Sequence, residues 1–141
     1  MIDPVVNMPL WFVVLHPITW LVTIPLEFIQ NTIILILFFN VININYKKAA
    51  YRQCILPLCL FTMIAHLNCA AILFFIMYFN MYNFVITIFG VFFSALLVYY
   101  LNLKITFRDI EATVSDIKRL SFAVAVFTAP YVFLLPADLI I

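Results

Sequence analysis

Several stretches of about 20 residues in this sequence contain no charged side chain, which is the length a helix needs to cross the hydrocarbon core of a bilayer. Of the 141 residues, 68% are hydrophobic and 9% are charged, and the mean hydropathy is +1.23. Soluble domains are about half apolar and a quarter charged, because water must wet their surface. A chain of this size has too small an interior to bury so many apolar side chains. The sequence therefore predicts an integral membrane protein.

The uncharged stretches divide the chain into predicted elements. We expect a single membrane domain over residues 1–141 that is all-α and consists of a bundle of four transmembrane helices. At 1.5 Å per residue the first of these helices is ~33 Å long, enough to cross a core of ~30 Å. The predicted spans are 25–46, 53–80, 83–103 and 121–141.

The N-terminal segment, residues 1–24, admits two interpretations. Residues 5–24 are uncharged, but prolines stand at positions 4, 9, 17 and 25, and His16 lies among them. A proline inside a helix removes a backbone hydrogen bond, and a histidine in mid-bilayer is costly. We expect an apolar, proline-broken segment that lies at the membrane interface or re-enters it. The alternative is a kinked fifth span that folds back at Pro25.

A helix of a different kind is predicted over residues 104–120. Phe107, Ile110, Val114 and Ile117 recur at the spacing of one helical face, and charged residues cover the opposite face. This pattern predicts an amphipathic linker helix at the cytosolic interface. The functional alternative is a docking helix for a partner protein.

All seven lysine and arginine residues lie in two connections, 46–52 and 104–120, which the predicted spans place on one side of the membrane. The positive-inside rule assigns this side to the cytosol, or to an equivalent compartment such as a matrix. A fifth span would leave this assignment unchanged. Lys47, Lys48 and Arg52 are also candidate contacts for lipid headgroups, although a dedicated site carries about four to eight such charges.

The composition argues against most catalytic and cofactor-dependent functions. A single glycine cannot build a P-loop or a dinucleotide-binding loop, both of which need several. The three cysteines form no CxxC motif, and the two histidines, 50 residues apart, form no HExxH motif. A net charge of +1 without a basic arm argues against nucleic acid as a partner. We therefore expect no catalytic constellation, no metal and no cofactor.

The candidate functional residues are the polar side chains inside the predicted spans. His66 and Cys69 share one stripe of the second span, where His66 would serve as a proton relay or substrate contact. Because no carboxylate is expected beside it within the bilayer, the simpler expectation is one hydrogen bond across a helix interface. Glu27, Gln30 and Asn31 form a polar patch on the first span. Glu27 is the best ion or proton site if buried, but its position favours an interfacial helix start.

Small residues recur every four positions on two predicted spans. Gly90 and Ser94 do so on the third span, and Ser121, Ala125 and Ala129 do so on the fourth. This spacing lets helices approach closely and is a packing signal. We expect close helix contacts at these five positions.

The sequence leaves three classes of function open. Our first expectation is a non-catalytic accessory, assembly or structural subunit of a larger membrane complex, with the lipid bilayer and other membrane subunits as partners. The second is a small transporter or channel-like unit that uses Glu27 or His66. The third is a lipid-modifying enzyme, which would need a cluster of acids and histidines near one interface. Contact between Glu27 and His66 would favour the second class over the first.

Overall fold

The computed structural model describes residues 15–42, 44, 46–79 and 84–134, and this part of the chain is helical without any strand. The longer elements are α-helices, η1 and η3 are 3-10 turns, and η2 is a single π-helical turn. In chain order the elements are η1 (Pro17–Thr19), α2 (Trp20–Val41), α3 (Lys47–Tyr78), α4 (Phe84–Leu101), η2 (Asn102–Thr106), α5 (Val114–Thr128) and η3 (Tyr131–Leu134).

Three helical segments of the described chain are long and apolar enough to cross a membrane, namely Pro17–Val41, Lys47–Tyr78 and Phe84–Thr106. Their 25, 32 and 23 residues extend over ~38, ~48 and ~35 Å, compared with a hydrocarbon core of ~30 Å. Many of their large apolar side chains point outward, as contact with lipid requires. The chain is a membrane protein, and the part of it that the structure describes is all-helical.

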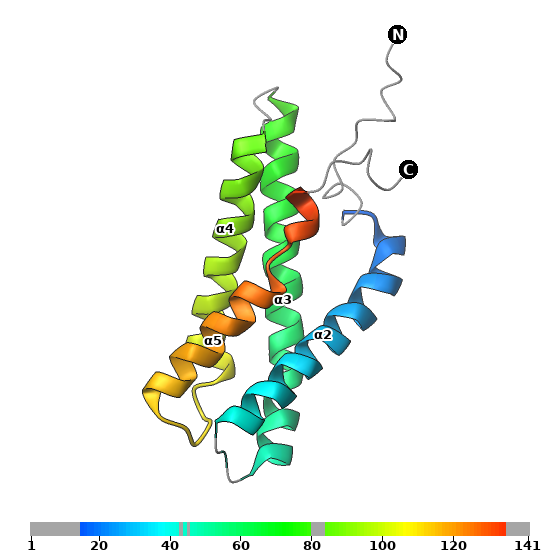
Figure 1. Ribbon diagram of the computed structural model, residues 1–141. Coiled ribbons are helices and arrows are strands. Elements are labelled where there is room, and N and C mark those ends of the chain that lie inside the picture. The colour runs from blue at the N-terminus through cyan, green and yellow to red at the C-terminus, as the bar shows by residue number, and fades with distance from the viewer. Residues whose placement is uncertain (1–14, 43, 45, 80–83, 135–141) are drawn as a thin grey trace.

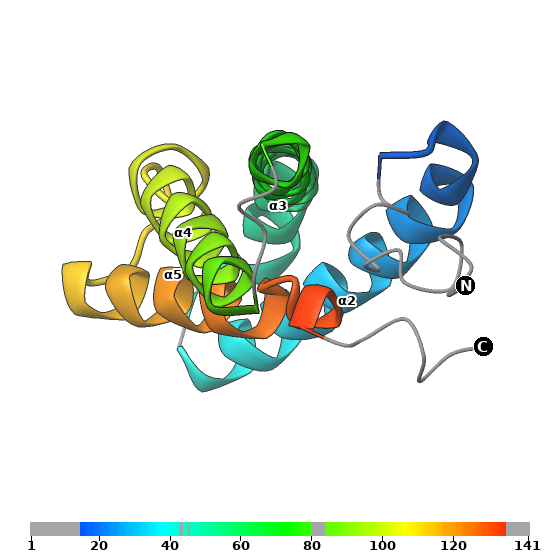
Figure 2. The same ribbon diagram turned by 90° about the horizontal axis from the view of Figure 1, so that it is seen from above.

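The four α-helices form a ring in which each helix packs against two neighbours (Figures 1 and 2). Helix α3 contacts α2 and α4, and α5 crosses the open side between α4 and α2. Leu35, Leu58, Val98 and Val124, one from each helix, are fully buried in the core that the ring encloses. The N-terminal half of α2 leans away from α3 (Figure 1).

The first span begins earlier than the sequence predicts. Helix α2 begins at Trp20, directly after η1, and Pro25 is its sixth residue. A proline so close to a helix start leaves only the carbonyl of Leu21 without its helical donor, so the helix continues through it. The predicted boundary at residue 25 is therefore wrong. The alternative of a fifth span that folds back at Pro25 is wrong in its turn, because α2 continues through this residue, and residues 1–14 lie outside the described residues.

The predicted linker helix over 104–120 is wrong in its first half. The chain leaves α4 through the π-helical turn η2, where the Phe107 N–H donates to the Asn102 carbonyl at 2.9 Å. Turns follow, because Phe107 and Ile110 are drawn into the core with exposures of 0% and 8%. Thr113 then caps α5, and its Oγ1 accepts from the Asp116 N–H at 3.2 Å.

The predicted span over 121–141 is interrupted. Helix α5 ends at Thr128, two residues before Pro130, whose missing N–H prevents the helical pattern from continuing. With 15 residues, α5 is ~22 Å long, too short to cross a core of ~30 Å by itself. Among the described residues the structure thus supports three spans and one shorter helix, and residues 135–141 lie outside them.

Small residues lie where the helices meet. A Cβ atom placed on Gly90 of α4 would lie 3.3 Å from the Cys69 Sγ and 3.3 Å from the Leu73 Cδ2 of α3. This position therefore sets how closely α3 and α4 approach. Gly90 itself is half-buried, and the other four small residues of the predicted contacts are buried: Ser94, Ser121, Ala125 and Ala129.

We expect Gly90→Leu to lower the free energy of unfolding by roughly 1–3 kcal/mol, because the new side chain forces α3 and α4 apart. Ala71 lies on an exposed face of α3, so Ala71→Leu adds similar bulk toward lipid and should change stability little. Thermal unfolding in mild detergent measures both. Equal shifts in the two variants would show that the contact at Gly90 does not hold α3 and α4 together.

Candidate functional site

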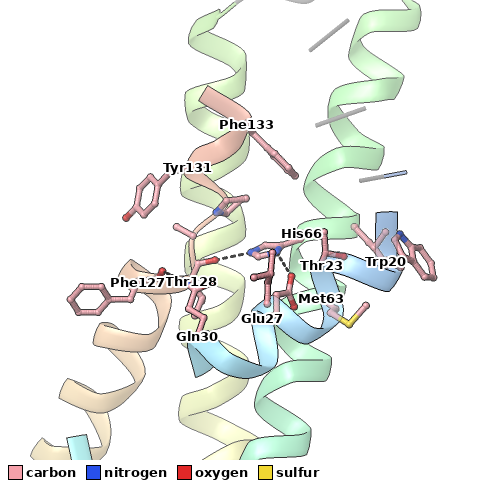
Figure 3. Close-up of a pocket in the computed structure, with 14 residues that line it drawn as sticks. Trp20, Thr23, Glu27, Gln30, Met63, His66, Phe127, Thr128, Tyr131 and Phe133 are labelled. Carbon is pink, nitrogen blue, oxygen red and sulfur yellow. Dashed lines mark hydrogen bonds and ion pairs between the residues drawn. The ribbon is translucent and has the colours of Figure 1, made fainter. Parts of the chain in front are cut away.

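Two ionisable side chains from different helices meet inside the bundle. Glu27 on α2 and His66 on α3 form an ion pair or hydrogen bond in which the Oε1 and Nδ1 atoms are 2.8 Å apart (Figure 3). Their side chains are only 14% and 15% exposed. His66 lies 14 residues beyond Arg52, the last basic residue of α3, or ~21 Å along the helix axis. The pair therefore lies at the depth of the hydrocarbon core.

The second ring nitrogen of His66 bonds to the broken end of α5. Its Nε2 lies 2.7 Å from the backbone carbonyl oxygen of Thr128 (Figure 3). A helix end leaves its last carbonyls without backbone donors, and lipid offers none. The Gln30 amide donates to the Phe127 carbonyl, and the Thr128 hydroxyl donates to the Val124 carbonyl at 2.8 Å. Side chains from α2 and α3 thus bind the last two carbonyls of the helix end that Pro130 creates.

Hydrogen-bond chemistry fixes how many protons the pair needs. The Thr128 carbonyl can only accept, so the Nε2 atom of His66 carries a hydrogen. The hydrogen bond between Nδ1 and Oε1 then requires one proton shared between them. An imidazolium facing a carboxylate and a neutral imidazole facing a protonated carboxyl both meet this requirement, and both have zero net charge. Without the shared proton, two lone pairs face each other and the pair carries a net negative charge.

The other carboxylate oxygen of Glu27 has no donor from the protein. Oε2 is buried and without a hydrogen-bond partner among the described residues. A buried acceptor left unpaired is costly, and more so when it is charged. The protein therefore satisfies one oxygen of this carboxyl group and leaves the other without a donor among the described residues.

An open cleft of about 340 Å³ borders the pair. It lies between the N-terminal half of α2, the middle of α3 and the segment from the end of α5 through η3. Trp20 and Phe133 stand on two sides of the pair (Figure 3), and the rings of Phe133 and His66 lie in a T-shaped arrangement with centroids 6.5 Å apart. The remaining lining includes Thr23, Gln30, Met63 and Tyr131 and is mostly apolar.

The structure brings together only some of the polar residues singled out from the sequence. Glu27, Gln30 and His66 share the cleft. Asn31 lies deeper in the bundle, where its side-chain amide donates to the Cys59 Sγ at 3.5 Å. Cys69 is 1% exposed, packs toward Gly90 of α4 and does not line the cleft.

The expectation that no carboxylate meets His66 is wrong. It rested on a helix start at residue 25, which would leave Glu27 in the first turn at the interface. Because α2 begins at Trp20, Glu27 is its eighth residue and lies within the span. The sequence did not indicate that the backbone carbonyls of Phe127 and Thr128 belong to the site, because such groups occur in every residue. The proline at position 130 was nevertheless a signal that a helix ends within this apolar segment.

The basic residues at the start of α3 lie apart from this cleft. Lys47, Lys48 and Arg52 are exposed, and the Lys47 ammonium donates to the Asn40 side-chain oxygen at 3.1 Å. No group of three or more potential metal ligands occurs among the described residues.

No protein-family model matches this chain, and no curated protein or solved structure shows significant similarity to it.

Proposed function

We propose that this protein is a small membrane transport unit in which Glu27 and His66 take up and release a proton. The observation that carries the proposal is the 2.8 Å contact between these two side chains at membrane depth. Ionisable residues inside a membrane are expensive and commonly belong to proton relays or substrate paths. A pair that keeps zero net charge while it holds one proton limits this cost, and loss of that proton changes its charge.

The broken helix beside the pair supports the same proposal. Unwound segments with free carbonyls are tolerated at membrane depth where they line a cavity, and transporters place their sites at such breaks. Here the break at Ala129 and Pro130 directly follows the carbonyl that His66 binds. His66 thus connects the proton site at Nδ1 to the end of α5 through its Nε2 atom.

Proton flux in vesicles that contain only this protein tests the proposal. A potassium diffusion potential drives protons inward, and an internal pH-sensitive dye reports the rate. We expect flux above that of protein-free vesicles. Equal rates in the two preparations would contradict transport by the chain alone.

A second candidate function is that of an accessory subunit in a larger membrane complex. The observation in its favour is an apolar groove of about 500 Å³ between α4 and α5, lined by residues that include Phe92, Leu96 and Phe122. Such a groove suits a helix of another membrane protein. Purification in mild detergent should then recover a defined partner in fixed ratio, whereas a transport unit should be active without one.

We place the two basic connections on the cytosolic or equivalent side of the membrane. The start of α3 and the start of α5 lie at the same end of the fold (Figure 1). We expect Lys48→Cys and Lys118→Cys, both at exposed positions, to react with an impermeant maleimide from the same side of sealed vesicles. The native protein measures background from its three cysteines. Reaction from opposite sides would contradict this arrangement.

A further inference from the structure

We propose, on the basis of the proton site above, that the cleft binds a monovalent organic cation with an apolar body. The bound cation takes the place of the proton shared by Glu27 and His66, so that the two exclude each other. Without the cation the pair takes up and releases protons as proposed above, and a bound cation displaces the proton and blocks this uptake.

The lining of the cleft has the chemistry that such a cation requires. Trp20 and Phe133 present aromatic rings on two sides of the acid (Figure 3), and aromatic faces attract cations, especially where water is excluded. Met63 adds a polarisable thioether to the wall. The volume of about 340 Å³ is at the lower end of small-molecule pockets, which fits a compact ligand.

The charge of the Glu27–His66 pair explains why the cation and the proton exclude each other. With its shared proton the pair is neutral and offers a cation no charge to pair with. Release of the proton leaves a Glu27 carboxylate beside a neutral His66, which still donates to Thr128 through Nε2. The site then has one negative charge, and the cation restores neutrality. One positive charge enters for each proton that leaves, and the cation then neutralises a carboxylate whose buried Oε2 atom has no donor among the described residues.

Few other ionisable groups can contribute to this exchange. The only further titratable side chain that lines the cleft among the described residues is the Tyr131 phenol, which is 51% exposed. Cys59 on α3 bonds to Asn31, deeper in the bundle. The charged residues of α3 and α5 lie at the start of each helix, far from the cleft: Lys47, Lys48, Arg52, Asp116, Lys118 and Arg119.

The experiment uses benzyltrimethylammonium, a permanent aromatic cation, and the full chain in detergent. The chain contains two tryptophans, so Trp11→Phe leaves Trp20 as the sole fluorescent indole and as a reporter of binding in the cleft. In weak buffer, we expect about one proton to be released for each cation bound. Because binding releases this proton, the apparent affinity for benzyltrimethylammonium should rise roughly tenfold for each unit by which the pH is raised, as long as the free pair holds its proton. Neopentylbenzene, the neutral molecule of the same shape, should release none.

Two Glu→Gln variants make the test specific. Glu27→Gln should abolish both proton release and the pH dependence of binding, whereas Glu111→Gln, at an exposed position outside the cleft, should leave both unchanged. Cation binding without proton release would overturn the exchange. Absence of cation binding, with proton flux through vesicles intact, would overturn this inference and leave the proposed function standing. Absence of Glu27-dependent flux would overturn the proposed function itself.

Discussion

We expect Glu27→Gln to reduce proton flux through vesicles to the level of protein-free vesicles while the protein stays folded. Glutamine has nearly the size of glutamate, and its amide donates a hydrogen bond to a neutral imidazole. The contact with the Nδ1 atom of His66 can therefore persist, as can the bond from Nε2 to the Thr128 carbonyl. What disappears is the group that gains and loses the proton. Flux is measured with the internal pH dye, and folding by helix content and thermal unfolding.

The control for this substitution is Glu111→Gln. Glu27 and Glu111 are the two glutamates of the chain, and Glu111 is exposed in the turn before α5. The same chemical change at this position should leave the flux intact. If the well-folded Glu27→Gln protein conducted protons as the native chain does, the pair would serve only to hold α2, α3 and α5 together, and the accessory-subunit proposal would gain.

Much of the fold follows from the distribution of charge and from local chemistry. The third predicted span agrees with α4, and the second with α3 except at its start, because no charged residue interrupts positions 53–103 and the apolar runs are long. Helix α3 begins at Lys47, so the predicted start at residue 53 is wrong and most of the predicted connection 46–52 is helical. The errors lie at the prolines and at the amphipathic segment. Pro25 reads as a helix start but is tolerated in the second turn of α2, whereas Pro130 ends α5 inside a run that is apolar on both sides.

The amphipathic segment shows why periodicity alone does not fix a helix. Phe107 and Ile110 have helical spacing, but both are buried by the core while the backbone turns around them. Thr113 then begins a new helix through its cap with Asp116. Local capping and tertiary burial together outweigh the helical pattern over this stretch.

The sequence identifies the polar residues of the candidate site but does not predict that they meet. Glu27, Gln30 and His66 stand out as polar residues in apolar surroundings. Their meeting depends on where α2 begins and on how far it leans from α3, which packing decides. The partners of Gln30 and His66 are backbone carbonyls, and these become available only because α5 ends at Thr128. A main-chain group exposed by a helix break leaves no side-chain signature.

The largest expected loss of stability comes from His66→Leu. This change removes the donor to the Thr128 carbonyl and the partner of Glu27 in one step. A buried charge that loses its partner typically costs roughly 3–5 kcal/mol, and both side chains here are less than one-sixth exposed, with values of 15% and 14%. Glu27→Leu should cost less, roughly 1–3 kcal/mol, because it leaves only the Nδ1 acceptor of a neutral imidazole unpaired. Unfolding in detergent with increasing SDS measures both.

The double variant, Glu27→Leu with His66→Leu, measures the interaction energy between the two side chains apart from their other contacts. We expect it to be more stable than the sum of the two single losses predicts, by roughly 0.5–3 kcal/mol, because neither side chain then leaves the other unpaired. His16→Leu is the matched control for the histidine substitution, since the His16 side chain is exposed before η1 and should change stability little. Strictly additive losses in the two leucine variants would show that Glu27 and His66 do not stabilise each other. The closure of α2 and α5 onto α3 would then depend on the Gln30 bond and on apolar packing alone.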